Sequence, residues 1–298
     1  MQPEIDIAFG FDAPYLPHLG ALIHSIIEHA PGARFRFIIL HDGIEEARKQ
    51  LMESVAPNAR FYWARVGDSD VPAYSGKTHF SRANFYRLGL EKLAPPDCQR
   101  VLYLDTDLIV LGDIREPWAT KLNGAPLAAV LDGYMLDGAE FAQSWSLSPS
   151  SVGYFNSGVL LIDLAQVRAR KLFSAAIDVA LAHGERLRFV DQDALNVVAW
   201  DLWQPMPPSW NAQRDMVIPT IAEHLPEEMR FDARLPKLVH FTGPEKPWVT
   251  TGYHPWSWLY WRHLNKTPFA REVSSAHGVS HAERFRLWFR WLRRKPRN

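Results

Sequence analysis

Two aspartates separated by one residue follow an apolar segment near the middle of the chain. Asp105-Thr106-Asp107 comes directly after Val101-Leu102-Tyr103-Leu104, which has the composition and length of a buried strand. In an extended chain residues i and i+2 point to the same side, so the two carboxylates would face one ligand. Holding two like charges away from water is costly unless a cation lies between them. The pattern predicts a site for Mg²⁺ or Mn²⁺, which leave coordination positions free for phosphate oxygens. The alternative is a turn in which the aspartates cap the next segment.

His240, at the end of a short apolar segment (237–241), is the candidate third ligand. An imidazole beside two carboxylates suits Mn²⁺ better than Mg²⁺, because nitrogen is the softer donor. A histidine in such a segment can equally be a core residue with its hydrogen bonds satisfied. The residues that follow favour the site: Gly243 would let the backbone approach a ligand closely, and Lys246 would offer a compact positive charge to a phosphate.

Other candidates each have a structural alternative. Asp191-Gln192-Asp193 opens a predicted helix (191–200). Acids are favoured there as N-terminal caps. Alternatively, the motif places Gln192 and one aspartate at a reacting sugar. Asn156 precedes a predicted strand (158–164) and could be a turn residue. Arg87 lies in a predicted helix (80–93), either lying along the surface or aimed at the edge of a sheet.

The segments that would position these residues alternate between strand and helix periodicity. Strands are predicted at 5–9, 34–40, 60–66, 100–104, 126–131, 158–164 and 237–241, and helices at 18–30, 45–55, 80–93, 164–183 and 191–200. The helix at 45–55 would turn Leu51, Met52 and Val55 inward. Alternation of this kind predicts a parallel sheet with helices on its faces. Polar residues follow the strands (Asp12, Asp105, Asp107, Asp132 and His240), and ligands bind at that edge of open α/β sheets.

Composition excludes several classes of protein. The 298 residues are 47% hydrophobic and 22% charged, which is typical of a globular chain and excludes a disordered, collagen-like or coiled-coil protein. No apolar run is long enough to span a bilayer, and the first residues do not resemble a secretory signal. A single cysteine, Cys98, excludes an intrachain disulfide and a cysteine-based zinc site, and favours a cytoplasmic protein.

Six segments in order make the sequence resemble glycosyltransferase family 8, the retaining nucleotide-sugar transferases that include glycogenin and bacterial lipopolysaccharide glucosyl- and galactosyltransferases. These segments are IAFGFD (7–12), FYRL (85–88), VLYLDTD (101–107), YFNSGVL (154–160), DQDALN (191–196) and HFTGPEKPW (240–248). The resemblance covers roughly residues 5–261. It implies a GT-A type α/β domain with a mostly parallel central sheet flanked by helices. It also implies a hexosyltransferase that moves glucose or galactose from a UDP-sugar to a glycan or lipopolysaccharide-type acceptor.

The resemblance implies a role for each matching residue. Asp105, Asp107 and His240 would bind Mn²⁺, with Mg²⁺ as an alternative, and Thr106, Gly243 and Lys246 would help to bind the UDP diphosphate. Asp12 and Tyr15 would contact uridine, although Ala13-Pro14 replaces residues that are commonly polar in the family. Arg87 would line the donor sugar with four candidate catalytic residues: Asp132, Asn156, Asp191 and Gln192. Since an amide is a poor nucleophile, we expect same-face attack with Gln192 orienting the sugar.

The C-terminal residues form a basic amphipathic segment. Residues 281–298 hold seven Lys or Arg and one acid, a net charge of +6, so the remainder of this neutral chain carries −6. Ser280 and Glu283 match a capping box. An apolar stripe follows, made of Phe285, Trp288, Phe289 and Leu292 and widened by Leu287 and Trp291. We therefore predict a catalytic domain (1–265), a linker (266–279) and a tail (280–298) that binds the anionic inner face of the cytoplasmic membrane. The alternative is a helix docked on the acidic body. Nucleic acid is not an expected partner, because the basic residues are confined to the tail.

Two other functions are compatible with parts of the pattern. A non-catalytic sugar-nucleotide-binding protein would not need the intact set of Asp105, Asp107 and His240. A sugar-1-phosphate nucleotidyltransferase would carry a glycine-rich basic loop after the first strand, and residues 10–15 lack one.

Overall fold

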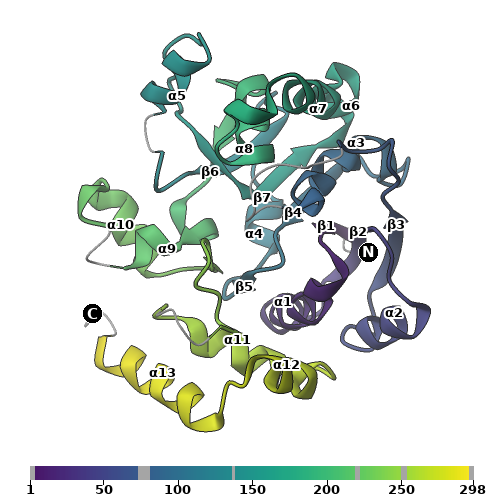
Figure 1. The fold of residues 1–298 in the computed structure, drawn as a ribbon, viewed down its shortest axis with the longest axis vertical. Helices are drawn as coiled ribbons and strands as arrows, with labels where there is room; N and C mark the ends of the chain where they lie inside the picture. Colours follow the sequence, from purple (N-terminus) through teal and green to yellow (C-terminus); the bar gives the residue numbers. More distant parts are fainter. Residues whose placement is uncertain (1–3, 73–80, 136–137, 219–221, 250–253, 295–298) are drawn as a thin grey trace.

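A seven-stranded sheet forms the centre of the computed structural model, which describes residues 4–72, 81–135, 138–218, 222–249 and 254–294 (Figure 1). The strands lie in the order β3-β2-β1-β4-β7-β6-β8. Their bounds are β1 Glu4–Gly10, β2 Arg34–His41, β3 Arg60–Arg65, β4 Arg100–Leu104, β6 Leu127–Leu131, β7 Phe155–Asp163 and β8 Trp203–Pro205. All neighbours pair parallel except β7, which runs antiparallel between β4 and β6. The predicted α/β fold with a mostly parallel sheet is confirmed.

Helices cover both faces of this sheet. The principal ones are α1 Leu16–His29, α2 Glu46–Glu53, α6 Leu164–Arg170, α7 Leu172–His183, α8 Val190–Val198, α11 Ser257–Leu264 and α12 Ala270–His277. Successive residues of β4 separate into two apolar clusters: Leu102 and Leu104 pack with α1 and α11, whereas Val101 and Tyr103 pack with α7 and α8. Both faces of β4 are therefore buried from Val101 to Leu104, as expected of a strand with a continuous apolar run.

A second, three-stranded sheet continues the chain beyond the aspartate pair. It contains β5 Leu108–Val110, β10 Leu238–His240 and β9 Ala212–Gln213, with β10 in the middle. β10 pairs antiparallel with β5, which places His240 opposite Leu108. This pairing brings together, at one edge of the main sheet, residues that are far apart in the sequence.

Several elements differ from the prediction. Residues 81–93 form a 3-10 helix, Arg82–Gly89, and a short α3, Leu90–Leu93, and residue 80 lies outside the described residues. The helix predicted at 164–183 is divided at Lys171, which has a φ of 52°. Leu51 was expected to face inward and is exposed, while Met52 and Val55 are buried. β7 begins at Phe155, so Asn156 lies within a strand and not in a turn before it.

The segment 201–236, which the sequence left unassigned, forms short elements. Apart from β8 and β9 they are a 3-10 helix Pro208–Asn211, α9 Arg214–Val217, a 3-10 helix Ala222–His224 and α10 Glu227–Arg234. The remaining short helices are α4 Arg115–Trp118, α5 Ala139–Ser144 and the 3-10 helices Ala13–Tyr15 and Gly184–Arg186.

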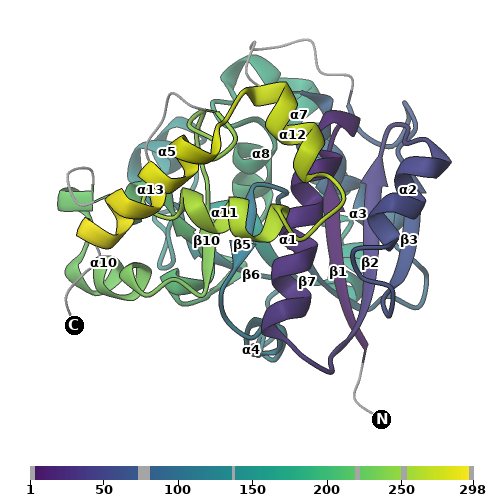
Figure 2. The ribbon, with the colours of Figure 1, turned by 90° about the horizontal axis from the view of Figure 1, so that it is seen from below.

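Two further helices, α12 and α13 (His281–Arg294), follow α11 and lie beside α11 and α1 (Figure 2). In the predicted linker, Phe269 and Val273 are buried in the same apolar cluster as α1, so this part of the segment packs against the body. The domain boundaries at residues 265 and 280 stay predictions. None of the helices in the described ranges is long and apolar enough to cross a membrane.

Candidate active site

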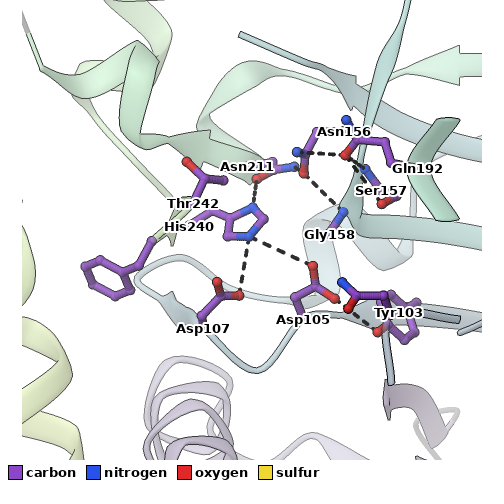
Figure 3. Close-up of polar contacts among 12 residues, drawn as sticks. Tyr103, Asp105, Asp107, Asn156, Ser157, Gly158, Gln192, Asn211, His240 and Thr242 are labelled. Carbon is purple, nitrogen blue, oxygen red and sulfur yellow. Dashed lines mark hydrogen bonds and ion pairs between the residues drawn. The ribbon is translucent and has the colours of Figure 1, made fainter. Parts of the chain in front are cut away.

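The aspartate pair and His240 meet where β4, β5 and β10 come together (Figure 3). Asp105 follows β4, Asp107 precedes β5, and the Phe241 amide donates to the Asp107 carbonyl at 3.0 Å. His240 Nε2 lies 3.3 Å from Asp107 Oδ1 and 4.0 Å from Asp105 Oδ2. Three ligand atoms of the predicted type therefore converge, each within 4.8 Å of the others.

Asn211 fixes the orientation of the His240 ring. His240 Nδ1 lies 2.9 Å from Asn211 Oδ1, and the Asn211 amide nitrogen donates to Asn156 Oδ1 at 2.9 Å. Because Asn211 Oδ1 can only accept, Nδ1 of a neutral ring carries the proton and Nε2 presents its lone pair to the carboxylates. Support of this kind is typical of a histidine that binds a metal. The donor set of two carboxylates and one such imidazole fits a divalent cation.

Lys246 provides the nearest positive charge. Its Nζ donates to Asp107 Oδ2 and to the Phe241 carbonyl, the latter at 2.8 Å. Burial alone would raise the pKa of Asp107, but Lys246 and His240 outweigh it and hold that pKa well below its ordinary value. Asp107 is therefore ionised, as a metal ligand must be.

Arg87 connects the aspartate pair to α8. This buried side chain donates from Nη2 to Asp105 Oδ1 at 2.9 Å and pairs through Nε with Asp191 Oδ2 at 2.8 Å. Burial disfavours its charge, but Asp105 and Asp191 more than compensate and raise the pKa of Arg87. Burial raises the pKa of Asp191 to about 7. Arg87 lowers this pKa only in part, because its guanidinium is shared with Asp105. Arg87 is thus aimed at the sheet edge and does not lie along the surface.

The two aspartates that open α8 have different surroundings. Asp193 Oδ2 accepts from the backbone amides of Arg188 and Phe189, just before α8, at 2.5 and 3.0 Å. The N-cap residue of α8 is Phe189, so neither aspartate is the N-cap that the structural alternative would require. Asp191 pairs with Arg87 in the site. Asp191 thus faces the cluster, whereas Asp193 holds the chain that leads into the helix.

Asn156, Asp132 and Gln192 form a buried network beside Arg87. Asn156 donates to Asp132 Oδ2 and to Gln192 Oε1, both at 3.1 Å, and Gln192 Nε2 donates to Asp132 Oδ2 at 3.1 Å. Ser157 donates its backbone amide to Gln192 Oε1 at 3.0 Å. Through Asn156 and Asn211 this network is continuous with His240. The structure thus brings the four candidate catalytic residues to one place.

The residues assigned to the nucleotide lie at the margin of the cluster. Asp12 follows β1, and Tyr15 is half-exposed with its ring edge-on to Trp248 at 6.0 Å. Trp248 stacks on His18 with ring centroids 3.6 Å apart. Burial chiefly raises the pKa of Tyr15, and the charges of Lys246 and Asp107 also act on its hydroxyl.

Two residues assigned to the diphosphate lie beside the metal-ligand residues in the sequence. Gly243 has a φ of 81°, a backbone conformation that favours glycine. Thr106, the residue between the aspartates, is buried.

Four residues that the sequence did not single out help to build the site. Tyr103 donates to Asp105 Oδ1 at 3.0 Å, Ser157 Oγ accepts from Arg87 at 3.0 Å, and Asn211 orients His240. Gly158 leaves room for the cluster, because a Cβ there would lie 2.3 Å from His240 Cε1. Tyr103, Ser157 and Gly158 adjoin residues that the sequence did single out, whereas Asn211 lies in a segment with no periodic signal.

A polar cluster at the ends of the strands of an open α/β sheet is typical of α/β enzymes, which bind their ligands at that edge. Residues 6–252 match the family described as Glycosyl transferase family 8, and the chain belongs to this family. The prediction of a hexosyltransferase of the family 8 type is confirmed at the level of the enzyme class.

Similar proteins support the assignment. General stress protein A of Bacillus subtilis is 27% identical over 86% of this chain and 91% of its own length. Lipopolysaccharide 1,2-glucosyltransferase of Escherichia coli is 28% identical over 89% of this chain and 79% of its own length. The structure of the galactosyltransferase LgtC with donor and acceptor sugar analogues superposes with a TM-score of 0.74 over 95% of this chain and 100% of that one. At 24% identity this likeness confirms the GT-A type fold and nothing finer.

Proposed function

We propose that this glycosyltransferase moves a hexose, glucose or galactose, from a UDP-sugar to a glycan or lipopolysaccharide-type acceptor with retention and with Mn²⁺. The observation that carries the proposal is the convergence of His240 Nε2, Asp105 and Asp107 beside the Lys246 ammonium. A lipopolysaccharide-type acceptor is suggested by relatives such as the Escherichia coli 1,2-glucosyltransferase.

Each part of the site has a task in this reaction. Cleavage of the sugar–phosphate bond leaves extra negative charge on the diphosphate. A divalent cation held by Asp105, Asp107 and His240 would act there as a Lewis acid. Lys246 would supply a fixed positive charge to the same leaving group when it exchanges Asp107 for a phosphate oxygen.

Gln192 is held by both ends of its amide and suits an orienting role. Its oxygen accepts from Asn156 and Ser157, and its nitrogen donates to Asp132 and to the Tyr154 hydroxyl. An amide engaged in this way can place a fixed dipole beside a sugar that develops positive charge. We therefore favour same-face attack of the acceptor over a covalent intermediate on Gln192.

The proposed donor and metal can be tested without knowing the acceptor. Purified protein, stripped of metal, would be incubated with UDP-, GDP- and ADP-sugars with and without Mn²⁺, and release of the nucleotide diphosphate measured. We expect slow Mn²⁺-dependent hydrolysis of one or two UDP-hexoses that EDTA abolishes. Tight UDP-sugar binding without any turnover would favour the non-catalytic alternative. Turnover that EDTA does not reduce would contradict the metal assignment.

We also propose that α13 attaches the enzyme to an anionic membrane surface, where a lipid-linked acceptor would lie. The first turn of α13 is docked on the body: Arg284 lies 3.9 Å over the Trp261 ring, and it donates to Asn265 at 3.2 Å. Beyond it Phe285, Trp288 and Phe289 are exposed by 62%, 37% and 41%. Exposed aromatic rings next to arginines are the features of a helix that lies in a membrane interface.

Truncation after Arg284 should separate membrane binding from folding, because it keeps the docked turn. We expect the chain 1–284 to retain donor hydrolysis and its thermal midpoint but to lose co-sedimentation with phosphatidylglycerol vesicles. Basic residues near such a surface contribute about 1 kcal/mol each, so high salt should also release the full chain. Neutral phosphatidylcholine vesicles are the matched control. If the truncated chain still co-sediments, or unfolds, the tail belongs to the body and the membrane proposal fails.

A further inference from the structure

A second cluster of metal-ligand side chains lies between α1 and α11, apart from the aspartate pair. His24 and Glu28 are one turn apart on α1, and His263 comes from α11. His263 is fully buried, whereas His24 is partly exposed and Glu28 is exposed. The cluster therefore has a fixed inner side and an open outer side.

The distances among its three facing atoms match those around a small tetrahedral cation. His24 Nδ1 lies 3.1 Å from His263 Nδ1 and 3.6 Å from Glu28 Oε2, and His263 Nδ1 lies 3.2 Å from the same oxygen. Ligands at the 2.0–2.1 Å bond lengths of zinc are separated by about 3.3 Å in a tetrahedron. The three separations are therefore close to those along one face of such a tetrahedron.

Protons alone satisfy this arrangement poorly. Two Nδ1 atoms at 3.1 Å can share only one proton, and Glu28 adds a third acceptor. A cation would satisfy all three lone pairs at once.

The surroundings of Glu28 support metal binding. Arg262 Nη2 donates to Glu28 Oε1 at 2.8 Å, which leaves Oε2 to face the two histidines. An outer hydrogen bond that orients a ligating carboxylate is a regular feature of metal sites. When His263 Nδ1 binds a metal, the ring proton must sit on Nε2, which is buried without a hydrogen-bond partner. Burying that unpaired N–H group lowers the affinity for the metal. We expect weaker binding than at a four-ligand structural zinc site.

We propose that His24, Glu28 and His263 form a zinc site that joins α1 to α11, with water as the fourth ligand. Two imidazoles and one carboxylate favour a borderline metal such as Zn²⁺ over Mg²⁺ or Mn²⁺. The site differs in this respect from the aspartate pair, which offers two carboxylates and one imidazole.

Joining α1 to α11 would strengthen a contact that supports the donor site. His18 of α1 lies 2.6 Å from the Tyr260 hydroxyl of α11 and stacks on Trp248, next to Tyr15. His24 and His263 hold the same two helices together further along α1. Zinc there stabilises the packing of the two helices and takes no part in sugar transfer.

Zinc binding is best measured on a chain in which the aspartate pair is disabled. Metal-free Asp107→Ala protein would be titrated with ZnCl₂ by calorimetry, and we expect one zinc ion per chain. Adding His24→Gln should weaken the zinc affinity by about 100-fold or more. Loss of an outer hydrogen-bond partner of a ligand already lowers metal affinity by about 10- to 100-fold, and loss of the ligand itself should cost at least as much. Co²⁺ in place of zinc should give the intense visible bands of tetrahedral coordination, and His24→Gln should remove them.

His29→Gln is the matched control, because His29 lies on the same helix with its ring centroid 5.9 Å from that of His263 and bonds the Ser25 carbonyl. It should leave zinc affinity and the cobalt bands unchanged. Glu28→Gln, at an exposed position, is a second test with little risk to folding, and should also weaken binding. The proposal is wrong if Asp107→Ala protein binds no zinc, or if His24→Gln and Glu28→Gln bind it as tightly as His29→Gln. None of these outcomes depends on whether the enzyme uses a UDP-sugar.

Discussion

Asp107→Ala should lower Mn²⁺-dependent sugar transfer by about 1000-fold or more while the fold survives. Removing this carboxylate deletes one cation ligand and leaves His240 and Asp105, whose facing atoms are 4.0 Å apart, as the remaining pair. It also leaves Lys246 without its carboxylate partner, so the charge balance around the diphosphate changes. Loss of one well-placed electrostatic group costs about 100- to 1000-fold in turnover, and here the cation is lost with it.

The measurement is UDP-hexose hydrolysis together with calorimetric binding of UDP in the presence and absence of Mn²⁺. We expect the variant to lose the Mn²⁺-dependent part of UDP binding and to keep a cooperative thermal transition. Asp113→Ala is the control, since Asp113 is a partly exposed aspartate that pairs with Arg115 outside the site. Wild-type turnover in the Asp107→Ala variant would contradict the assignment of this residue as a metal ligand.

The sequence predicts the three residues of the candidate metal site, because their signals are local. Asp105 and Asp107 follow an apolar strand, and His240 ends another, so the type of residue and its position on a strand were both visible. Their meeting depends on the pairing of His240 with Leu108. Pairing between segments so far apart leaves no local signal, so His240 was proposed as a ligand from its place at a strand end and from the family resemblance, without this pairing.

Other parts of the site could not be predicted from periodicity. Arg87 lies on a 3-10 helix whose sequence reads as an ordinary α-helix, and its burial depends on Asp105 and Asp191 arriving from other elements. Asn211 lies among prolines and tryptophans with no periodic pattern, yet it sets the orientation of His240. Asn156 was expected before a strand and lies within β7, where partners such as Gln192 satisfy its polar side chain, and such distant partners leave no mark on the local sequence.

A methyl group added at Gly158 should disable the same site without removing any ligand. The Cβ of an alanine would lie 2.3 Å from His240 Cε1 and 2.8 Å from Asp105 Oδ2, distances at which something must move. The backbone of β7 cannot easily retreat, because the Gly158 carbonyl accepts from the Asp105 amide at 2.9 Å. The two ligands would be pushed apart instead, and a displacement of about 1 Å at reacting groups can cost about 100-fold in rate.

We therefore expect Gly158→Ala to lower turnover by about 100-fold and to raise the Mn²⁺ concentration needed for half-maximal activity. Excess Mn²⁺ should recover part of the loss, because the donor atoms remain and only their spacing changes. The thermal midpoint should fall modestly, since overpacking costs about 1–3 kcal/mol. Gly184→Ala is the matched control, because an added methyl there meets nothing within 4 Å and the backbone φ is −52°. Unchanged Mn²⁺ dependence in the Gly158 variant would mean that His240 and Asp105 do not share a cation.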